Sequence, residues 1–175
     1  MTSHGCGETK KRWLTLCRQI IGLAGWLLLT FIVSAIGAVA SLQAKSFYGQ
    51  LAQPAWAPPS GVFGPVWTVL YVFMAVAAWL VWCSGGFRQN RWALGFFLGQ
   101  LVFNALWSWL FFGWHLGGWA FADILALLVS LAITLVLFWR VRPAAGALLI
   151  PYFLWVTFAA VLNYVIWQMN PRVLG

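Results

Sequence analysis

The stretch from Ala145 to Gln168, AGALLIPYFLWVTFAAVLNYVIWQ, contains no charged side chain. An α-helix needs about 20 predominantly apolar residues to cross the hydrocarbon core of a bilayer, so this stretch is long enough to span it. Backbone exposed to lipid must satisfy its hydrogen bonds within a helix or a closed barrel. Barrel strands are about ten residues of alternating polarity, which this uniformly apolar stretch does not show. It therefore predicts a transmembrane helix.

Four further apolar runs precede this one. The chain has 63% apolar and 7% charged residues, whereas a typical soluble domain has about 25% charged residues. We predict an all-α membrane protein, a bundle of five transmembrane helices at about 20–42, 65–84, 92–113, 119–139 and 145–168. The bundle would form one membrane domain over residues 19–170, preceded by a polar, basic tail over residues 1–18.

The basic residues lie at the ends of the predicted spans and divide unevenly between the two sides of the membrane. Eight fall on one side: Lys10, Lys11, Arg12, Arg18, Arg88, Arg91, Arg140 and Arg142. Lys45 and Arg172 fall on the other. The positive-inside rule then predicts a cytoplasmic N-terminus and an outer C-terminus in an inner or plasma membrane. The net charge of +8 is spread too thinly to indicate a nucleic-acid partner.

The connection between the first two spans is long and rich in proline. Its first half, Ser41–Leu51, is amphipathic and favours a helical turn at the membrane interface. Its second half cannot be helical, because prolines fix φ, remove backbone donors and push the preceding residue into extended geometry. We interpret this half as a stiff lid over the mouth of the bundle, formed by Pro54, Trp56, Pro58, Pro59 and Phe63.

The N-terminal region has two features with alternative interpretations. His4, Cys6 and Glu8 resemble a metal cluster, but the composition favours a disordered tail, and no metal site is expected. The basic stretch, the apolar run and the small residues Gly37–Ala40 resemble a secretory signal with its cleavage site. The apolar run is long for a signal, which favours an uncleaved span.

Polar side chains inside the spans are costly in lipid, so each one is a functional hypothesis. They fall on three helix faces, which carry Gln100, Asn104 and Ser108, then Asp123, Ser130 and Thr134, and finally Tyr152, Trp155 and Asn163. Three such faces would enclose a largely aromatic pocket with a few hydrogen-bonding groups, as in many small-molecule sites.

Each of these polar residues also has a structural interpretation. Amides within spans often join helices, and the sequence leaves this role and ligand contact equally open for Gln100 and Asn104. Asp123, near the start of its span, is expected to stabilise the helix N-terminus. No catalytic site is expected, because the chain has two acidic residues and lacks the motifs of hydrolases, phosphate-binding loops and metal sites.

Two glycine pairs suggest specific backbone roles. Gly95 and Gly99 form a G-x-x-x-G pattern, which lets two helices approach closely and favours a homodimer through the third span. Gly117 and Gly118 are expected to supply the backbone freedom of a tight turn between the third and fourth spans.

Four segments carry a resemblance to a known family. They are WAPPSGVFGPVWTVLY (56–71), QLVFNALWSWLFFG (100–113), AFADILALLVS (120–130) and IPYFLWVTFAAVLNY (150–164). In their sequence, order and spacing they resemble the TspO/MBR family, also called translocator proteins, peripheral benzodiazepine receptors or tryptophan-rich sensory proteins. The resemblance covers about residues 20–170 and is closest to the bacterial type.

The resemblance implies a five-helix bundle, commonly dimeric, with a ligand cavity closed by the first loop. Family members bind porphyrins such as protoporphyrin IX, sterols such as cholesterol and benzodiazepine-type drugs, and bacterial members act in tetrapyrrole regulation and stress responses. Light-dependent porphyrin degradation, or transport of tetrapyrroles or sterols, is the alternative function. The resemblance implies porphyrin as a ligand, and it implies no obligatory cofactor. By position, the family's ligand-binding residues correspond to Tyr48, Trp67, Gln100, Asn104, Trp155 and Ala159.

One departure concerns sterols. The sterol-recognition pattern of animal members places a basic residue soon after the tyrosine of the fifth span. Here Gln168 follows Tyr164 at that place, and Arg172 comes too late. This lowers the expectation of tight cholesterol binding.

Overall fold

The computed structural model describes the backbone from residue 4 to residue 175 and the surroundings of side chains from residue 17 onward. Within this part of the chain no strand is present. The long helices are α1 (His4–Ala40), α3 (Phe63–Cys83), α5 (Arg91–Ser108), α6 (Gly117–Val141) and α7 (Pro143–Met169). The short elements are α2 (Ala44–Gln50), the 3₁₀ turn η1 (Ser60–Val62), α4 (Gly86–Gln89), the π-helical turn η2 (Trp109–Gly113) and α8 (Pro171–Leu174).

The predicted spans are confirmed. Five segments of the described chain are helical, long enough and apolar enough to cross a membrane: Cys17–Ala40, Ser60–Cys83, Arg91–Gly113, Gly117–Val141 and Pro143–Met169. The protein is therefore a multi-pass integral membrane protein with an all-helical fold.

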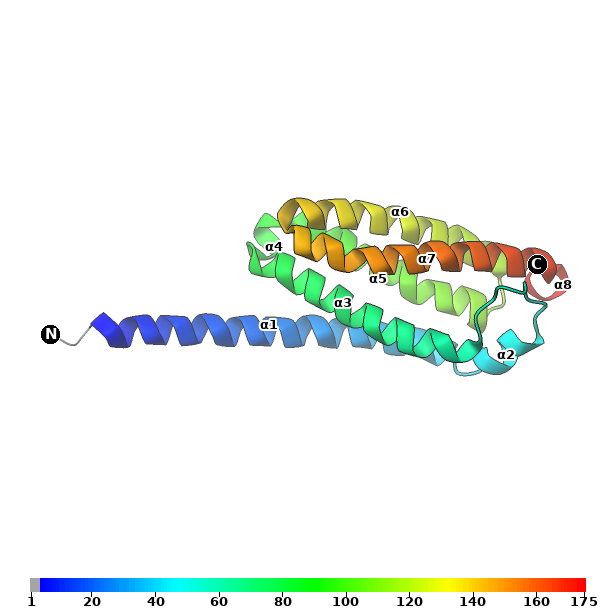
Figure 1. The fold of residues 1–175 in the computed structure, drawn as a ribbon, viewed down its shortest axis with the longest axis horizontal. Helices are drawn as coiled ribbons and strands as arrows, with labels where there is room; N and C mark the ends of the chain where they lie inside the picture. Colours follow the sequence, from blue (N-terminus) through cyan, green and yellow to red (C-terminus); the bar gives the residue numbers. More distant parts are fainter. Residues whose placement is uncertain (1–3) are drawn as a thin grey trace.

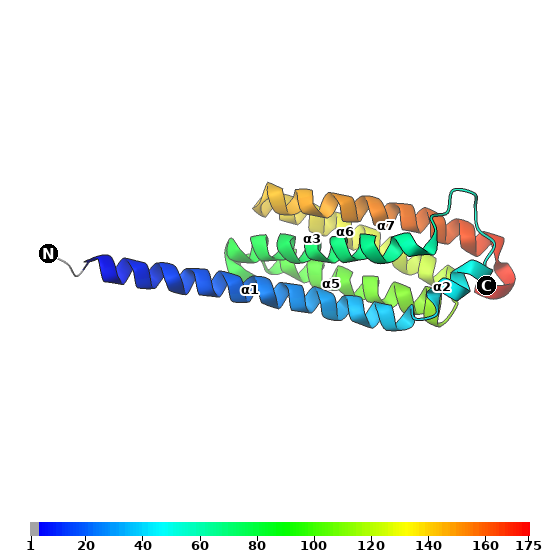
Figure 2. The ribbon, with the colours of Figure 1, turned by 60° about the horizontal axis from the view of Figure 1, so that its bottom comes forward.

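The five long helices run side by side and alternate in direction (Figure 1). One end of the bundle holds α4 and the junction of α6 with α7; we call this the closed end. The other end holds α2, α8 and the loop over residues 51–59; we call this the lid end (Figure 2). The loop over residues 84–91 and the α6–α7 junction, which carry four of the arginines, both lie at the closed end, whereas Lys45 and Arg172 lie at the lid end. The grouping of these residues agrees with the sequence prediction, and the orientation in a membrane stays a prediction.

Helix α1 is longer than predicted. It begins at His4 and extends well beyond the closed end of the bundle, so the backbone from residue 4 to residue 18 is helical rather than disordered (Figure 1). This segment contains no proline, and lysine, arginine, leucine and glutamate favour helix, which explains the continuation of the span. His4, Cys6 and Glu8 lie outside the part of the chain whose side chains the structure describes.

The two connections at the lid end also differ from expectation in detail. Helix α3 begins at Phe63 rather than at Pro65, which is tolerated because the first helical turn has no acceptor for the missing N–H. In the α5–α6 turn the left-handed residue is His115, with φ of 57°, and not a glycine. Gly117 and Gly118 lie in the first turn of α6, where an added Cβ would come within 2.8 or 2.9 Å of Trp167. Their role is close packing against α7, so the predicted role as turn residues is wrong.

The half of the bundle at the closed end is tightly packed. Its core combines small residues of α3 with large residues of the neighbouring helices, all with no more than 2% of their surface exposed: Met74, Ala75, Ala77, Ala78, Val81, Leu94, Phe97, Leu131, Phe138 and Leu149. Phe97 and Phe138 stack with their ring centroids 5.6 Å apart. This close packing fixes the positions of the helices relative to one another in this half of the bundle.

Candidate ligand-binding cavity

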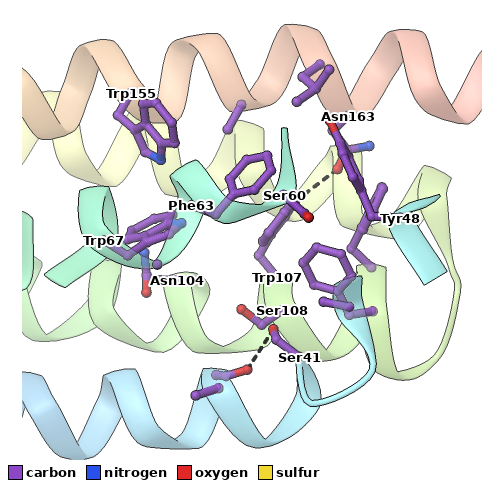
Figure 3. Close-up of a pocket in the computed structure, with 18 of the residues that line it drawn as sticks. Ser41, Tyr48, Ser60, Phe63, Trp67, Asn104, Trp107, Ser108, Trp155 and Asn163 are labelled. Carbon is purple, nitrogen blue, oxygen red and sulfur yellow. Dashed lines mark hydrogen bonds between the residues drawn. The ribbon is translucent and has the colours of Figure 1, made fainter. Parts of the chain in front are cut away.

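A cavity of about 550 Å³ occupies the half of the bundle at the lid end. All five long helices contribute to its walls, together with α2 and η1. Of the residues that the family resemblance implied, the lining includes Tyr48, Trp67, Asn104, Trp155 and Ala159. Figure 3 shows Trp67, Asn104 and Trp155 at one end of this space and Tyr48 at the other, with Ser60 between them. The volume lies within the range of about 300–1,000 Å³ found for small-molecule sites.

Aromatic rings form the deep walls of the cavity. Trp67 packs edge-on against Tyr152 and tilted against Tyr71, with centroid distances of 6.0 and 5.7 Å. Trp155 packs edge-on against Phe63 at 6.1 Å. The indole N–H of Trp155 is buried and has no hydrogen-bond partner within the described residues. The deep end therefore offers flat, polarisable faces, with one donor that lacks an acceptor.

A chain of hydrogen bonds forms the floor of the cavity. The Tyr71 hydroxyl donates to Asn104 Oδ1, and Asn104 Nδ2 donates to the Tyr152 hydroxyl at 3.0 Å. Tyr152 donates in turn to Gln100 Oε1 at 2.8 Å, and Gln100 Nε2 contacts Met74 Sδ at 3.8 Å. The chain joins α3, α5 and α7 and satisfies polar groups that are costly to leave unpaired in lipid. It separates the cavity from the packed closed half.

Gln100 and Asn104 therefore take different positions. Gln100 is fully buried, lies one helical turn below the cavity and is absent from its lining. Its side chain joins α5 to Tyr152 of α7 and Met74 of α3, which favours the structural role. Asn104 belongs both to the floor and to the lining, because its amide bonds Tyr71 and Tyr152 while part of its surface faces the cavity.

The loop that follows α2 closes over the cavity as an extended strap, which we define as residues 51–59. The strap crosses α7 before it joins η1 (Figure 2). The Tyr48 hydroxyl donates to the carbonyl of Pro58 at 3.3 Å, and Trp56 packs edge-on against Phe158 of α7 at 5.8 Å. Burial raises the pKa of Tyr48, so its phenol stays protonated and available as a donor. Phe63, at the start of α3, lines the cavity below the strap.

Asn170 fastens the strap to the end of α7, a role that the sequence analysis did not identify. Its Oδ1 accepts from the backbone N–H of Ala52 at 2.9 Å, and its Nδ2 donates to the carbonyl of Ala52 at 2.9 Å. The same Nδ2 also donates to the carbonyl of Ile166 at 2.8 Å. An asparagine just past a helix end and before Pro171 is a typical helix stop, which is the one signal that marked this position.

The polar face of α6 points away from the cavity. Ser130 donates to the carbonyl of Phe96 in α5 at 3.4 Å, and Thr134 donates to the carbonyl of Ser130 at 2.8 Å. Helix α6 contributes Ile124 and Leu127 to the lining instead. The prediction that its polar residues enclose the pocket is therefore wrong, because they serve contacts between and within helices.

Asp123 also differs from its predicted role. Helix α6 begins at Gly117, so Asp123 lies in the second turn and caps nothing. Its side chain is buried, and Oδ2 has no hydrogen-bond partner within the described residues. Nothing in the structure explains this carboxylate.

The side wall at the lid end is held by Asn163. Its Oδ1 accepts from the indole N–H of Trp107 at 2.9 Å (Figure 3). Its Nδ2 donates to the carbonyl of Gly117 at 3.2 Å. One amide thus links α5, α6 and α7. Its bond to Trp107 fixes the ring that forms this part of the wall.

Gly95 and Gly99 lie outside the cavity. They line an open groove on the outer face of α5 together with Phe96 and Phe103, and an added Cβ at either glycine would meet nothing within 4 Å. The groove is continuous with Ser130 of α6. The glycine face thus lies on the outside of the bundle, separate from the ligand cavity, and the homodimer stays a prediction.

Comparison with known proteins identifies the family. The sequence profile of the TspO/MBR family matches residues 20–168. The chain belongs to the TspO/MBR family. It is 41% identical to the translocator protein of Homo sapiens over 126 residues, which is 71% of this chain and 75% of the relative.

Prokaryotic relatives of this TspO/MBR chain match over a longer range. The tryptophan-rich protein TspO of Chlorobaculum tepidum is 36% identical over 157 residues, covering 88% of this chain and 99% of the relative. The tryptophan-rich sensory protein of Cereibacter sphaeroides is 36% identical over 149 residues, covering 83% of this chain and 92% of the relative. The bundle described above therefore includes nearly the whole of these relatives.

Proposed function

We propose that this TspO/MBR protein is a membrane receptor for planar hydrophobic ligands, chiefly porphyrins such as protoporphyrin IX. The observation that carries the proposal is the cavity of about 550 Å³ whose deep walls are the rings of Trp67 and Trp155. Flat aromatic walls favour a flat ring system through stacking and dispersion. Sterols and benzodiazepine-type drugs are further candidates, with sterols weaker because the basic residue after Tyr164 is missing.

A titration of protoporphyrin IX, followed by its Soret absorbance in lipid nanodiscs, tests this proposal. Trp67→Ala and Trp155→Ala should each weaken binding about tenfold or more, because each removes one wall of the site. Trp119→Ala is the matched control, since Trp119 is 70% exposed on the outside of α6. Equal affinities in all three variants would show that the ligand does not occupy this cavity.

We also propose a homodimer through the groove of α5 that Gly95 and Gly99 line. The open space above these glycines would let a second α5 approach closely, and close packing drives helix association in lipid. Gly99→Leu should convert the dimer to a monomer in light scattering or crosslinking. Gly25→Leu is the control, because its Cβ also meets nothing but lies on α1. A dimer that persists in Gly99→Leu would place the interface elsewhere.

A further inference from the structure

Among the described residues that line the cavity, the only charge is positive. Within the described residues, Lys45 of α2 is the one charged side chain of the lining. The chain has only two acidic residues, and Asp123, the one whose surroundings are described, is not part of the lining. The ammonium group of Lys45 therefore has no carboxylate partner among the described lining residues.

Polarity also changes along the cavity. Trp67 and Trp155 lie at the deep end, whereas the hydroxyls of Ser41, Ser60 and Ser108 lie nearer the lid end (Figure 3). Lys45 belongs to the same end, because α2 lies at the lid end of the bundle. A ligand with an apolar ring system and a polar edge would thus enter with its ring first and keep its polar edge at the rim.

We propose that Lys45 makes the cavity selective for ligands that carry a carboxylate at one edge. A lysine side chain can lay its alkyl stem along the apolar rim and place its charge at the interface. Lys45 is exposed at this rim, and its compact ammonium attracts a carboxylate that a bound ligand holds beside it. This inference rests on the proposed function and adds the ligand class: anionic planar amphiphiles bind better than neutral ones of the same shape.

Protoporphyrin IX and its dimethyl ester provide the test, because they share one macrocycle and differ in the charge of two side chains. Both are titrated by Soret absorbance in nanodiscs of neutral lipid, with protein-free nanodiscs as the blank. Lys45→Ala should weaken binding of the acid about two- to fivefold and leave binding of the ester unchanged. Lys45→Arg should retain the preference for the acid, and high salt should reduce it.

The control is Arg172→Ala, which removes a cation at the same end of the bundle that is not part of the lining. The inference is overturned if Lys45→Ala leaves the affinity for the acid unchanged, or weakens the acid and the ester equally. It is also overturned if Arg172→Ala has the same effect as Lys45→Ala. If neither compound binds the unmodified protein, the proposed function itself fails, which is a separate result.

Discussion

The two halves of the bundle are built from the same five helices but packed in opposite ways. The closed half interlocks alanines of α3 with Phe97, Phe138 and Leu149. The lid half is lined by glycines, serines and tryptophans among other residues, and it contains a cavity of about 550 Å³. The floor of hydrogen bonds through Asn104 and Tyr152 divides them. The difference indicates that the closed half provides stability and the lid half provides binding.

The largest expected effect is a loss of stability in the closed half. Phe138→Ala removes a fully buried ring that stacks on Phe97, and should cost about 3 kcal/mol in thermal or chemical unfolding. Phe63→Ala, at the cavity, should leave stability nearly unchanged and weaken ligand binding. Equal destabilisation by both substitutions would remove the distinction between the two halves.

Removing hydrogen bonds from the floor should have an intermediate effect on stability. Tyr152→Phe keeps the ring against Trp67 but removes the donor to Gln100 and the acceptor for Asn104. Interhelical hydrogen bonds in membranes contribute about 1 kcal/mol, so a stability loss of about 1–2 kcal/mol is expected. Tyr164→Phe serves as the control, because Tyr164 is 46% exposed on the outer face of α7. A Tyr152→Phe protein as stable as this control would show that the floor is not structural.

The Asn170 contact should affect binding kinetics more than stability. Asn170→Ala removes both bonds to the backbone of Ala52 and leaves the packing of Trp56 on Phe158 to hold the strap against α7. Ligand dissociation, measured by stopped-flow displacement, should accelerate about fivefold, as the loss of about 1 kcal/mol implies. Thr157→Ala removes only a bond within α7 and should change nothing. An unchanged dissociation rate in Asn170→Ala would mean that the strap does not control exit.

The smallest expected effect concerns the stiffness of the strap. Replacing Pro58 and Pro59 with glycine increases the conformational freedom of the open strap and so raises the entropic cost of closing it. Ligand affinity in equilibrium titrations should fall about two- to fivefold, and the unfolding temperature should fall slightly, because glycine also raises the conformational entropy of the unfolded chain. Unchanged affinity would identify the strap as a connector rather than a lid.

Much of the fold could be predicted because charge and apolar length fix transmembrane spans directly. Segments matching all five spans are present, and the amphipathic stretch became α2, because both patterns depend on local composition alone. The predicted start of α1 was wrong because disorder was inferred from polarity, although residues 4–18 contain no proline and helix-favouring residues outnumber Gly5 and Gly7. His115 as the left-handed residue could not be foreseen from the sequence, because its ring packs tilted against Phe47 of α2, with the centroids 4.1 Å apart, and only the folded chain forms this contact.

The candidate site was predictable only in part. Trp67, Trp155 and Ala159 line the cavity as the resemblance implied. The sequence left the role of Gln100 open, because a polar side chain one turn deeper in the same helix looks identical in sequence, and only its bond to Tyr152 shows that it belongs to the floor. Asn170 was missed because its partner, the backbone of Ala52, is 118 residues away in the chain.

Filling the cavity tests the central claim most directly. Ala159 lines the cavity, whereas Val161, two residues along α7, is 53% exposed on its outer side. Titration of protoporphyrin IX should show that Ala159→Phe loses saturable binding while Val161→Phe keeps the affinity of the unmodified protein, with both variants equally stable. Unimpaired binding in Ala159→Phe would contradict the account, because the ligand would then lie outside the cavity of the lid half.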